Sequence, residues 1–239
     1  SQTGARAAFA AALASWSEVA NVNFVEVAGP YNGSGDTSGY DWIETFSILD
    51  GDLYGQHHLP HPGTLKGEYN TDAGIFTTAG VKPGGPGFSA FVHETGHGLG
   101  LLHPHNEEGD APDDPIFPGV TDPWALGDYR LNQAIYTVMT YNFAFEVVGI
   151  PVPADFCWEM GPMALDIAAI QRIYGANMTT RTGHTVYELH AANQSGTGWK
   201  AIWDAGGPVI VCFWHSRIAV SPACWPLDRA QEPRALISL

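Results

Sequence analysis

The sequence is poor in cysteine and in basic residues, and each shortage excludes a class of protein. Three cysteines, Cys157, Cys212 and Cys224, are too few for the framework of a disulfide-rich mini-domain. A single bridge between Cys212 and Cys224 and incidental free thiols both stay open. Ten Lys and Arg residues against 25 Asp and Glu residues give a formal net charge of -15. This charge repels phosphate backbones and anionic membrane surfaces, so we expect neither nucleic acid nor a membrane as a partner.

Long apolar runs and internal repeats are also missing. No stretch is long enough to cross a bilayer, and no spacing recurs along the chain. The first residues lack a basic segment followed by an apolar core, so either the protein stays inside the cell or its targeting and pro-segments lie outside this chain. The 239 residues, 45% of them apolar, are enough for one large folded domain or two small ones.

Hydrophobic periodicity predicts helices and strands in alternation, which indicates an α/β fold. Residues 5–20 place apolar side chains, Trp16 among them, at helical steps. Further helices are predicted at 88–98, which ends at the pair Gly98 and Gly100, and at 162–174, which ends before Gly175. On the last helix one face would carry Met163, Ile167, Ile170 and Ile173. Strands are predicted at 22–27, 43–49 and, more weakly, 67–76, and no regular element is predicted from residue 208 onward.

The helix at 88–98 carries the strongest chemical signal, because the chain reads HExxHxxGxxH from His93 to His103. His93 and His97 are four residues apart, so on a helix both imidazoles leave the same face and reach one cation. Gly100 lets the backbone turn back sharply and deliver His103 as a third nitrogen ligand. Glu94 leaves the neighbouring face, where it can hold a water without binding the metal. Three imidazoles and a water are the open coordination of a catalytic zinc.

A second motif follows the histidines. The five fixed positions of HExxHxxGxxH would coincide by chance with a probability of roughly 10⁻⁴. A solvated helix with incidental histidines is therefore less expected than a zinc site. Downstream, residues 137–141 read TVMTY. Taken alone, Met139 is core filler and Tyr141 is a half-buried aromatic. Beside a zinc motif, Met139 resembles the methionine of the turn that lies beneath the metal in metzincin proteases, and Tyr141 resembles a phenol that binds the metal.

Together these motifs resemble the serralysins, the secreted bacterial branch of the metzincin proteases. Pro104 directly after the third histidine and Tyr141 two residues after Met139 are typical of that family. The resemblance covers most of residues 5–207. It extends to the stretches ASWSEV at 14–19, DIAAIQ at 166–171, YGAN at 174–177, TTRTGHTVY at 179–187 and WDAGG at 203–207.

The resemblance implies a metzincin catalytic domain over residues 1–178, of the α/β (α+β) class. It would contain a twisted mixed sheet, the active-site helix and a second helix after the methionine turn. Residues 179–239 would be a partial C-terminal region similar to the start of a calcium-binding β-roll domain, divergent after residue 207. No strand is predicted before the first helix, and the GGxGxDxUx repeats of the family do not occur. We therefore expect a chain that is truncated at both ends.

The resemblance also implies a function. The chain would be a secreted, monomeric zinc endopeptidase in which His93, His97, His103 and Tyr141 bind zinc. Glu94 would be the general base, and Tyr141 would leave the metal to stabilise the oxyanion. Extended protein or peptide substrates would lie against an edge strand between Gly51 and Pro60, and a proteinaceous inhibitor is a further candidate partner. The resemblance also implies a calcium site formed by Arg181, Gly183, Thr185, Asp204 and Gly206. Val209 stands where the family has an acidic residue for the same site.

Several alternatives stay open at this point. The chain could be a catalytically inactive zinc-binding fragment, whereas a zinc amidase is disfavoured by the methionine turn. A second metal site at His57, His58 and His61 is less expected than three exposed loop histidines. A solvated loop is favoured over bound calcium for an acidic cluster formed by Glu107, Glu108, Asp110, Asp113 and Asp114.

Overall fold

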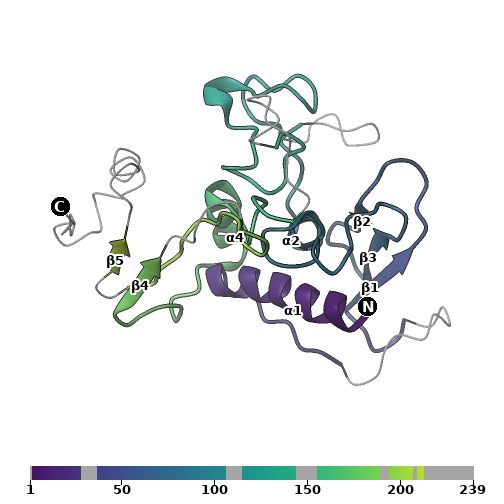
Figure 1. Ribbon diagram of the computed structural model, residues 1–239, viewed down its shortest axis with the longest axis horizontal. Helices are drawn as coiled ribbons and strands as arrows, with labels where there is room; N and C mark the ends of the chain where they lie inside the picture. The colour runs from purple at the N-terminus through teal and green to yellow at the C-terminus, as the bar shows by residue number, and fades with distance from the viewer. Residues whose placement is uncertain are drawn as a thin grey trace. The chain divides into compact units, whose positions relative to one another are not determined.

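The computed structural model (Figure 1) describes residues 2–27, 37–105, 115–143, 155–188, 194–206 and 209–212. The chain divides into two compact units. The first consists of residues 1–177 and 193–202, and the second of residues 178–192 and 203–239. The expected boundary between residues 178 and 179 stays a prediction of domain organisation. Within the described ranges, no helix is both long and apolar enough to cross a membrane.

The first helix, α1 (Gln2–Val19), confirms the helix predicted at 5–20. Its alanine-rich sequence favours the helical backbone, and a buried stripe of Ala12, Trp16 and Val19 faces the interior. Trp16 is fully buried, and its indole Nε1 donates to the carbonyl of Val92 at 3.2 Å. This contact holds α1 alongside the helix that carries the zinc motif (Figure 1).

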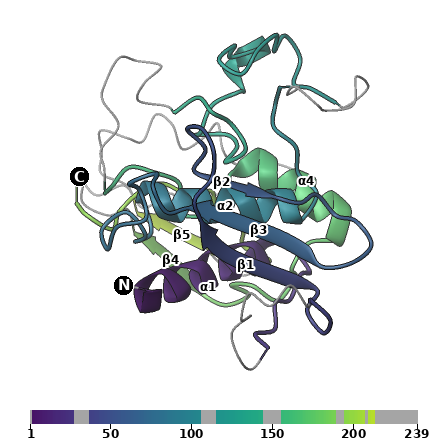
Figure 2. The ribbon, with the colours of Figure 1, turned by 90° about the vertical axis from the view of Figure 1, so that its right-hand side faces the viewer.

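A mixed three-stranded sheet lies against the helix that carries the zinc motif (Figure 2). Its strands are β1 (Trp42–Ser47), β2 (Gly55–His57) and β3 (Leu65–Asn70), in the order β1-β3-β2. β1 runs parallel to β3 with Phe46 opposite Tyr69, whereas β2 is antiparallel to β3 with Gly55 opposite Tyr69. The prediction at 43–49 is confirmed as β1. The weak prediction at 67–76 is displaced, since β3 begins and ends earlier.

The strand predicted at 22–27 is wrong. These residues form no strand, and nearby only Ala20 makes a bridge, to Ala176. Val25 and Val27 are 76% and 51% exposed. A β-branched sequence is stable as a strand only where it packs against a neighbouring strand and a buried face, and the described structure offers this segment neither.

The helix with the zinc motif, α2 (Pro86–Gly98), begins two residues before the predicted 88–98 and is buried on almost every side. Pro86 stands in its first turn, where a missing N–H costs nothing. Phe91 packs edge-on against Phe9 of α1 and Tyr69 of β3, with ring centroids 5.7 and 4.8 Å apart. Because the rings come from three elements, this core fixes α2 between α1 and the sheet.

The helix predicted at 162–174 is confirmed as α4 (Ala164–Tyr174) and ends at Gly175. Met163, Ile167 and Ile170 are buried, as the periodicity predicted. Ile173 is 53% exposed, so the prediction of a four-residue buried face is wrong at its last position. The described chain between the two helices contains a short 3₁₀ helix, η1 (Asp128–Arg130), but mainly turns.

In the second unit, β4 (Thr185–Glu188) pairs in parallel with β5 (Val209–Cys212). The expectation that no regular element follows residue 208 is therefore wrong for the run Val-Ile-Val-Cys. Parallel strands are usually continuous apolar runs without alternation of apolar and polar residues, so the search for periodicity did not detect β5. Cys157 is a free thiol. The Cys212–Cys224 pairing lies outside the described residues because Cys224 does.

The mixed sheet and the helices on either side of the methionine segment agree with the predicted α/β class. The three helices and small mixed sheet fit a metzincin-like fold. The methionine turn as a family feature and the β-roll remnant stay predictions.

Candidate metal centre

Three histidine side chains converge at the C-terminal end of α2. The Nε2 atoms of His93 and His97 are 3.2 Å apart, and that of His103 lies 3.0 and 3.1 Å from them. Tetrahedral nitrogen ligands at 2.0–2.1 Å from zinc would be about 3.3 Å apart. Within the part of the chain that the structure describes, this is the one group of three or more His, Cys, Asp or Glu side chains that could hold a metal ion.

The end of α2 brings the third histidine back to the other two. Gly100 has a φ of +100°, a left-handed conformation that favours glycine. Its N–H donates to the carbonyl of His97 at 2.8 Å, and the N–H of Leu101 donates to the carbonyl of Gly96 at 2.9 Å. These two bonds form a Schellman motif, which ends the helix and reverses the chain. His103 therefore leaves the turn toward His93 and His97.

Backbone carbonyls orient two of the imidazoles. Nδ1 of His93 lies 2.7 Å from the carbonyl of Val138, and Nδ1 of His97 lies 2.9 Å from that of Leu101. A carbonyl can only accept, so each Nδ1 carries the proton and each Nε2 presents a lone pair. Two lone pairs 3.2 Å apart repel each other unless a cation lies between them. The donor set therefore fits a zinc ion.

The carbonyl that orients His93 is itself held by α4. The N–H of Val138 and the hydroxyl of Thr137 donate to the carboxylate of Asp166 at 2.7 and 2.5 Å. The N–H of Met163 donates to the same carboxylate at 2.8 Å and thereby caps the helix. Burial nevertheless raises the pKa of Asp166 to about 6. The sequence showed Asp166 only as one letter of a family-like stretch. A carboxylate in the first turn of a buried helix was the available signal.

Met139 lies directly under the zinc-motif helix. Its side chain is 2% exposed, and a Cβ placed on Gly96 would lie 2.5 Å from its sulfur. Gly96 is one of the two variable residues between His93 and His97. A glycine there leaves room for the methionine against the helix backbone, which is a contact that the motif alone did not predict.

Glu94 is buried beside the edge strand. Its side chain is 5% exposed, and a Cβ on Gly55 of β2 would lie 2.9 Å from its Cγ and 3.0 Å from Oε1. Burial, with the nearby carboxylates of Glu44 and Glu94, raises the pKa of Tyr69 well above its usual range. The carboxylate therefore sits between β2 and the core, on the helix that carries His93.

Tyr141 lies beside the histidines, and Trp124 lies beside Tyr141. The ring of Tyr141 lies 4.7 Å from that of His103 and 6.2 Å from that of His93, centroid to centroid. The ring of Trp124 lies 6.2 Å from that of Tyr141 and is 65% exposed. Sequence reasoning singled out Tyr141 but missed Trp124, which stands in a Pro-rich loop with no periodic signal.

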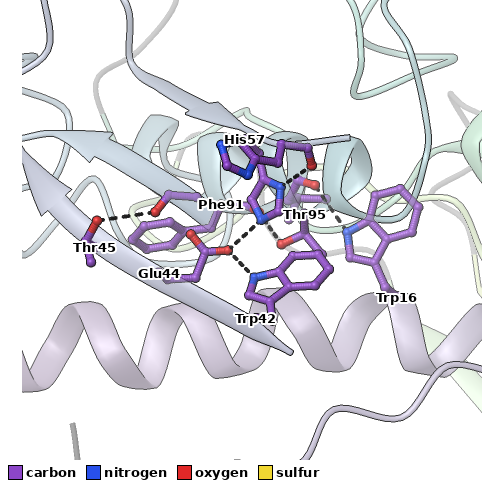
Figure 3. A network of polar contacts seen from close by, with 10 residues as sticks. Trp16, Trp42, Glu44, Thr45, His57, Phe91 and Thr95 are labelled. Carbon is purple, nitrogen blue, oxygen red and sulfur yellow. Dashed lines mark hydrogen bonds and ion pairs between the residues drawn. The ribbon is translucent and has the colours of Figure 1, made fainter. Parts of the chain in front are cut away.

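The expectation that His57 is an exposed loop residue is wrong. Its side chain is fully buried, its Nε2 lies 3.2 Å from Oε1 of Glu44, and its ring lies 4.4 Å from that of Trp42 (Figure 3). The indole of Trp42 donates to the same carboxylate oxygen. Glycines make the space: a Cβ on Gly67 would lie 1.9 Å from Glu44 and one on Gly98 2.5 Å from His57. His58 and His61 are exposed, as predicted.

The calcium set lies in the second unit. The carboxylate of Asp204 accepts from the hydroxyl of Tyr187 at 2.8 Å and from the N–H of Gly206 at 3.1 Å. Arg181 donates to the carbonyl of Trp203 at 3.1 Å, and Thr185 donates to that of Arg181 at 3.4 Å. A Cβ placed on Gly183 would meet nothing within 4 Å among the described residues. Calcium here stays a prediction. The acidic cluster of residues 107–114 lies outside the described residues.

The mixed sheet, the three helices and the three-histidine cluster fit the metzincin class of metal-dependent proteases. No protein-family model matches the chain. Individual proteins do. The chain is 35% identical over 212 residues to serralysin C of Dickeya chrysanthemi, with 82% of this chain and 40% of that protein covered.

Two further relatives give the same result. The chain is 31% identical over 221 residues to a serralysin of Photorhabdus sp. (strain Az29), which covers 84% of this chain and 41% of that protein. It is 31% identical over 214 residues to the serralysin of Proteus mirabilis, with 85% and 40% covered. The chain is therefore homologous to the serralysin-type metzincins over most of its length, and it spans about two-fifths of the length of these relatives.

Proposed function

We propose that this chain is a zinc-dependent endopeptidase that hydrolyses peptide bonds of proteins. The observation that carries the proposal is the convergence of His93, His97 and His103 through their Nε2 atoms, beside the buried carboxylate of Glu94. Homology to serralysins supports the same activity. These three histidines would hold the ion.

A bound zinc ion would supply Lewis acidity, which polarises a carbonyl and lowers the pKa of a bound water. Glu94 then accepts the proton of the attacking water and delivers it to the leaving amine. Gly55 leaves the room that this side chain occupies, because a Cβ at position 55 would lie only 2.9 Å from its Cγ. Tyr141, whose ring lies beside His103, donates a hydrogen bond from its phenolic O–H to the oxyanion.

The substrate would bind as an extended strand along β2. Among the described strands, β2 pairs only with β3, so its other edge can pair with a peptide backbone. A Cβ on Gly55 of this strand would lie 3.0 Å from Oε1 of Glu94, so a peptide added there lies near the proposed base. Exposed Trp124 beside Tyr141 offers an apolar surface to a substrate side chain.

The remaining expectations follow from the resemblance to the family. We infer that the protein is secreted and acts as a monomer on protein substrates, with a proteinaceous inhibitor as a candidate partner. Calcium at Asp204 and its neighbours is part of the same inference.

The test combines zinc content with casein cleavage. We expect one zinc per chain by elemental analysis and cleavage that Glu94→Gln abolishes, because the amide keeps the volume beside Gly55 but accepts no proton. Glu68→Gln, on β3, is the matched control and should keep full activity. Zinc without cleavage would favour the inactive zinc-binding fragment, and absence of zinc would contradict the metal site. Each assay is run with and without calcium.

A further inference from the structure

A second pair of histidines lies in the loop between β2 and β3, outside the cluster described above. Nδ1 of His58 is 3.1 Å from Nε2 of His61, and the ring centroids are 5.1 Å apart. The separation of these nitrogens equals that within the three-histidine cluster, where it is 3.0 to 3.2 Å. Both side chains are exposed, so an ion can reach them from solvent.

The imidazole of His61 is oriented in the way that is found for the two histidines of α2. Its Nδ1 lies 2.9 Å from the carbonyl of Pro62. This carbonyl can only accept, so Nδ1 carries the proton and Nε2 presents its lone pair toward His58. A carbonyl that fixes the tautomer of a histidine is the usual outer support of a metal ligand.

The backbone around the pair is rigid. The N–H of His58 donates to the carbonyl of Lys66 at 2.9 Å, which continues the β2–β3 ladder. The carbonyl of His58 accepts from Nδ1 of the buried His57 at 2.7 Å. Pro60 and Pro62 fix the backbone φ on both sides of His61. The two imidazoles are therefore held near each other before any ion binds, which lowers the entropic cost of binding.

The charges around His58 also favour a neutral imidazole. Its pKa is lowered by partial burial first, and then by His61, His57 and Lys66, whereas Glu68 acts in the opposite direction. His57 is not a third ligand, because it is buried and paired with Glu44.

We propose that His58 and His61 form a second metal site, which binds one divalent transition-metal ion through two imidazole nitrogens, with solvent completing the coordination. Imidazole suits zinc, nickel and copper rather than calcium or magnesium. The site stands apart from the proposed protease activity and does not depend on it. Pro60, between the two histidines, lies 3.5 Å from the place where a Cβ on Gly100 would be. The ion would thus fasten the loop that lies over the end of α2.

The experiment uses the full chain with zinc already bound at the first site. Copper(II) is added, and its uptake is followed by calorimetry and by the nitrogen hyperfine pattern in its electron paramagnetic resonance spectrum. Retained zinc is measured in parallel, so exchange at the first site is detected. We expect one copper ion per chain with two coordinated nitrogens and unchanged zinc. His58→Gln or His61→Gln should weaken copper binding about tenfold or more.

His184→Gln, which removes an exposed histidine of the second unit, is the control and should bind copper like the wild type. Circular dichroism shows whether each variant is folded. Wild type that takes up no copper beyond the first site would overturn the proposal. So would equal copper affinity in the wild type and in both loop variants. Neither result would bear on cleavage of casein, so failure here is distinguishable from failure of the proposed protease.

Discussion

Asp166 and His93 are connected through the backbone of a single residue, Val138. The N–H of Val138 donates to Asp166 at 2.7 Å, and the carbonyl of Val138 lies 2.7 Å from Nδ1 of His93. A carboxylate on α4 thus fixes the backbone that orients an imidazole on α2, although the two residues are distant in sequence. The geometry of the metal centre therefore depends on the packing of α4.

Asp166→Asn tests this connection. The amide keeps the volume but replaces one acceptor oxygen by a donor, so at least one of the three groups that donate to the carboxylate loses its acceptor. We expect a loss of stability on the order of 1–3 kcal/mol and about tenfold weaker zinc binding, measured by denaturant unfolding and by competition with a chelator. Asp52→Asn, on an exposed turn, should change neither. Unchanged zinc affinity in Asp166→Asn would show that Val138 does not need this support.

Glu159 predicts a pH dependence of stability. Its side chain is buried and accepts from Ser89 at 2.7 Å, and burial raises its pKa from the ordinary 4.5 to about 7. The folded state then binds the proton more tightly than the unfolded state. The contribution of Glu159 to the free energy of unfolding is therefore greatest below about pH 4.5, falls as the pH rises to about 7, and is constant above.

Glu159→Gln removes this dependence. The free energy of unfolding of the wild type should fall more steeply between pH 4.5 and 7 than that of the variant, by at most about 3 kcal/mol over the interval. The pKa of Asp166 is also raised, so a smaller fall of the free energy of unfolding with pH remains in both proteins. Denaturant unfolding at a series of pH values measures the difference, with the exposed Glu18→Gln as control. Parallel curves for all three proteins would contradict a raised pKa at Glu159.

Gly96→Ala tests the position of Met139. The new Cβ would lie 2.5 Å from the methionine sulfur, so one of the two must shift. We expect destabilisation of about 1–3 kcal/mol. Truncation of the Met139 side chain removes the clash. The double variant Gly96→Ala/Met139→Ala should therefore lose less stability than the sum of the losses in the two single variants. Gly183→Ala, which meets nothing within 4 Å, is the control. Strict additivity would place Met139 away from Gly96.

Trp124→Ala tests the apolar surface beside Tyr141. The loop is firmly held: Asp122 accepts from the N–H groups of Trp124 and Ala125 at 3.0 and 3.1 Å. On the other side, Asn132 and Asn142 donate to the carbonyl of Pro123. A fixed and exposed indole suits binding of an apolar substrate side chain. If the protease activity is present, KM for peptides with such a side chain should rise several-fold while kcat changes little. Tyr129→Ala, at an exposed aromatic of the same loop, should leave KM unchanged.

Sequence patterns predicted those elements whose local signal agrees with their packing. α1 and α4 have clear helical periods, and the HExxHxxGxxH motif specifies a helix and its end. The strand predicted at 22–27 failed because β-propensity does not tell whether a neighbouring strand exists. β5 was missed because a short apolar run has no period to detect.

The candidate site divides in the same way. His93, His97 and His103 could be named because their spacing alone places them together. The contacts of Asp166 with Val138 and of Gly96 with Met139 link segments far apart in the chain, so no local pattern encodes them. His57 was misjudged for a related reason. Its loop reads as exposed, but Gly67 and Gly98, which leave room for its ring and its partner Glu44, lie elsewhere in the sequence.

The place where α2 ends decides how many protein ligands the metal has. A helix advances by about 100° per residue, so a helix that continued to residue 103 would carry His103 about 240° round the axis from His97. Only His93 and His97 would then share a face, and the ion would have two protein ligands instead of three. The first effect of replacing Gly100 by a residue that disfavours the left-handed conformation would thus be a lower number of protein ligands on the metal. If position 100 is randomised and the variants are selected for zinc binding alone, we expect glycine to be the most frequent residue and asparagine the next.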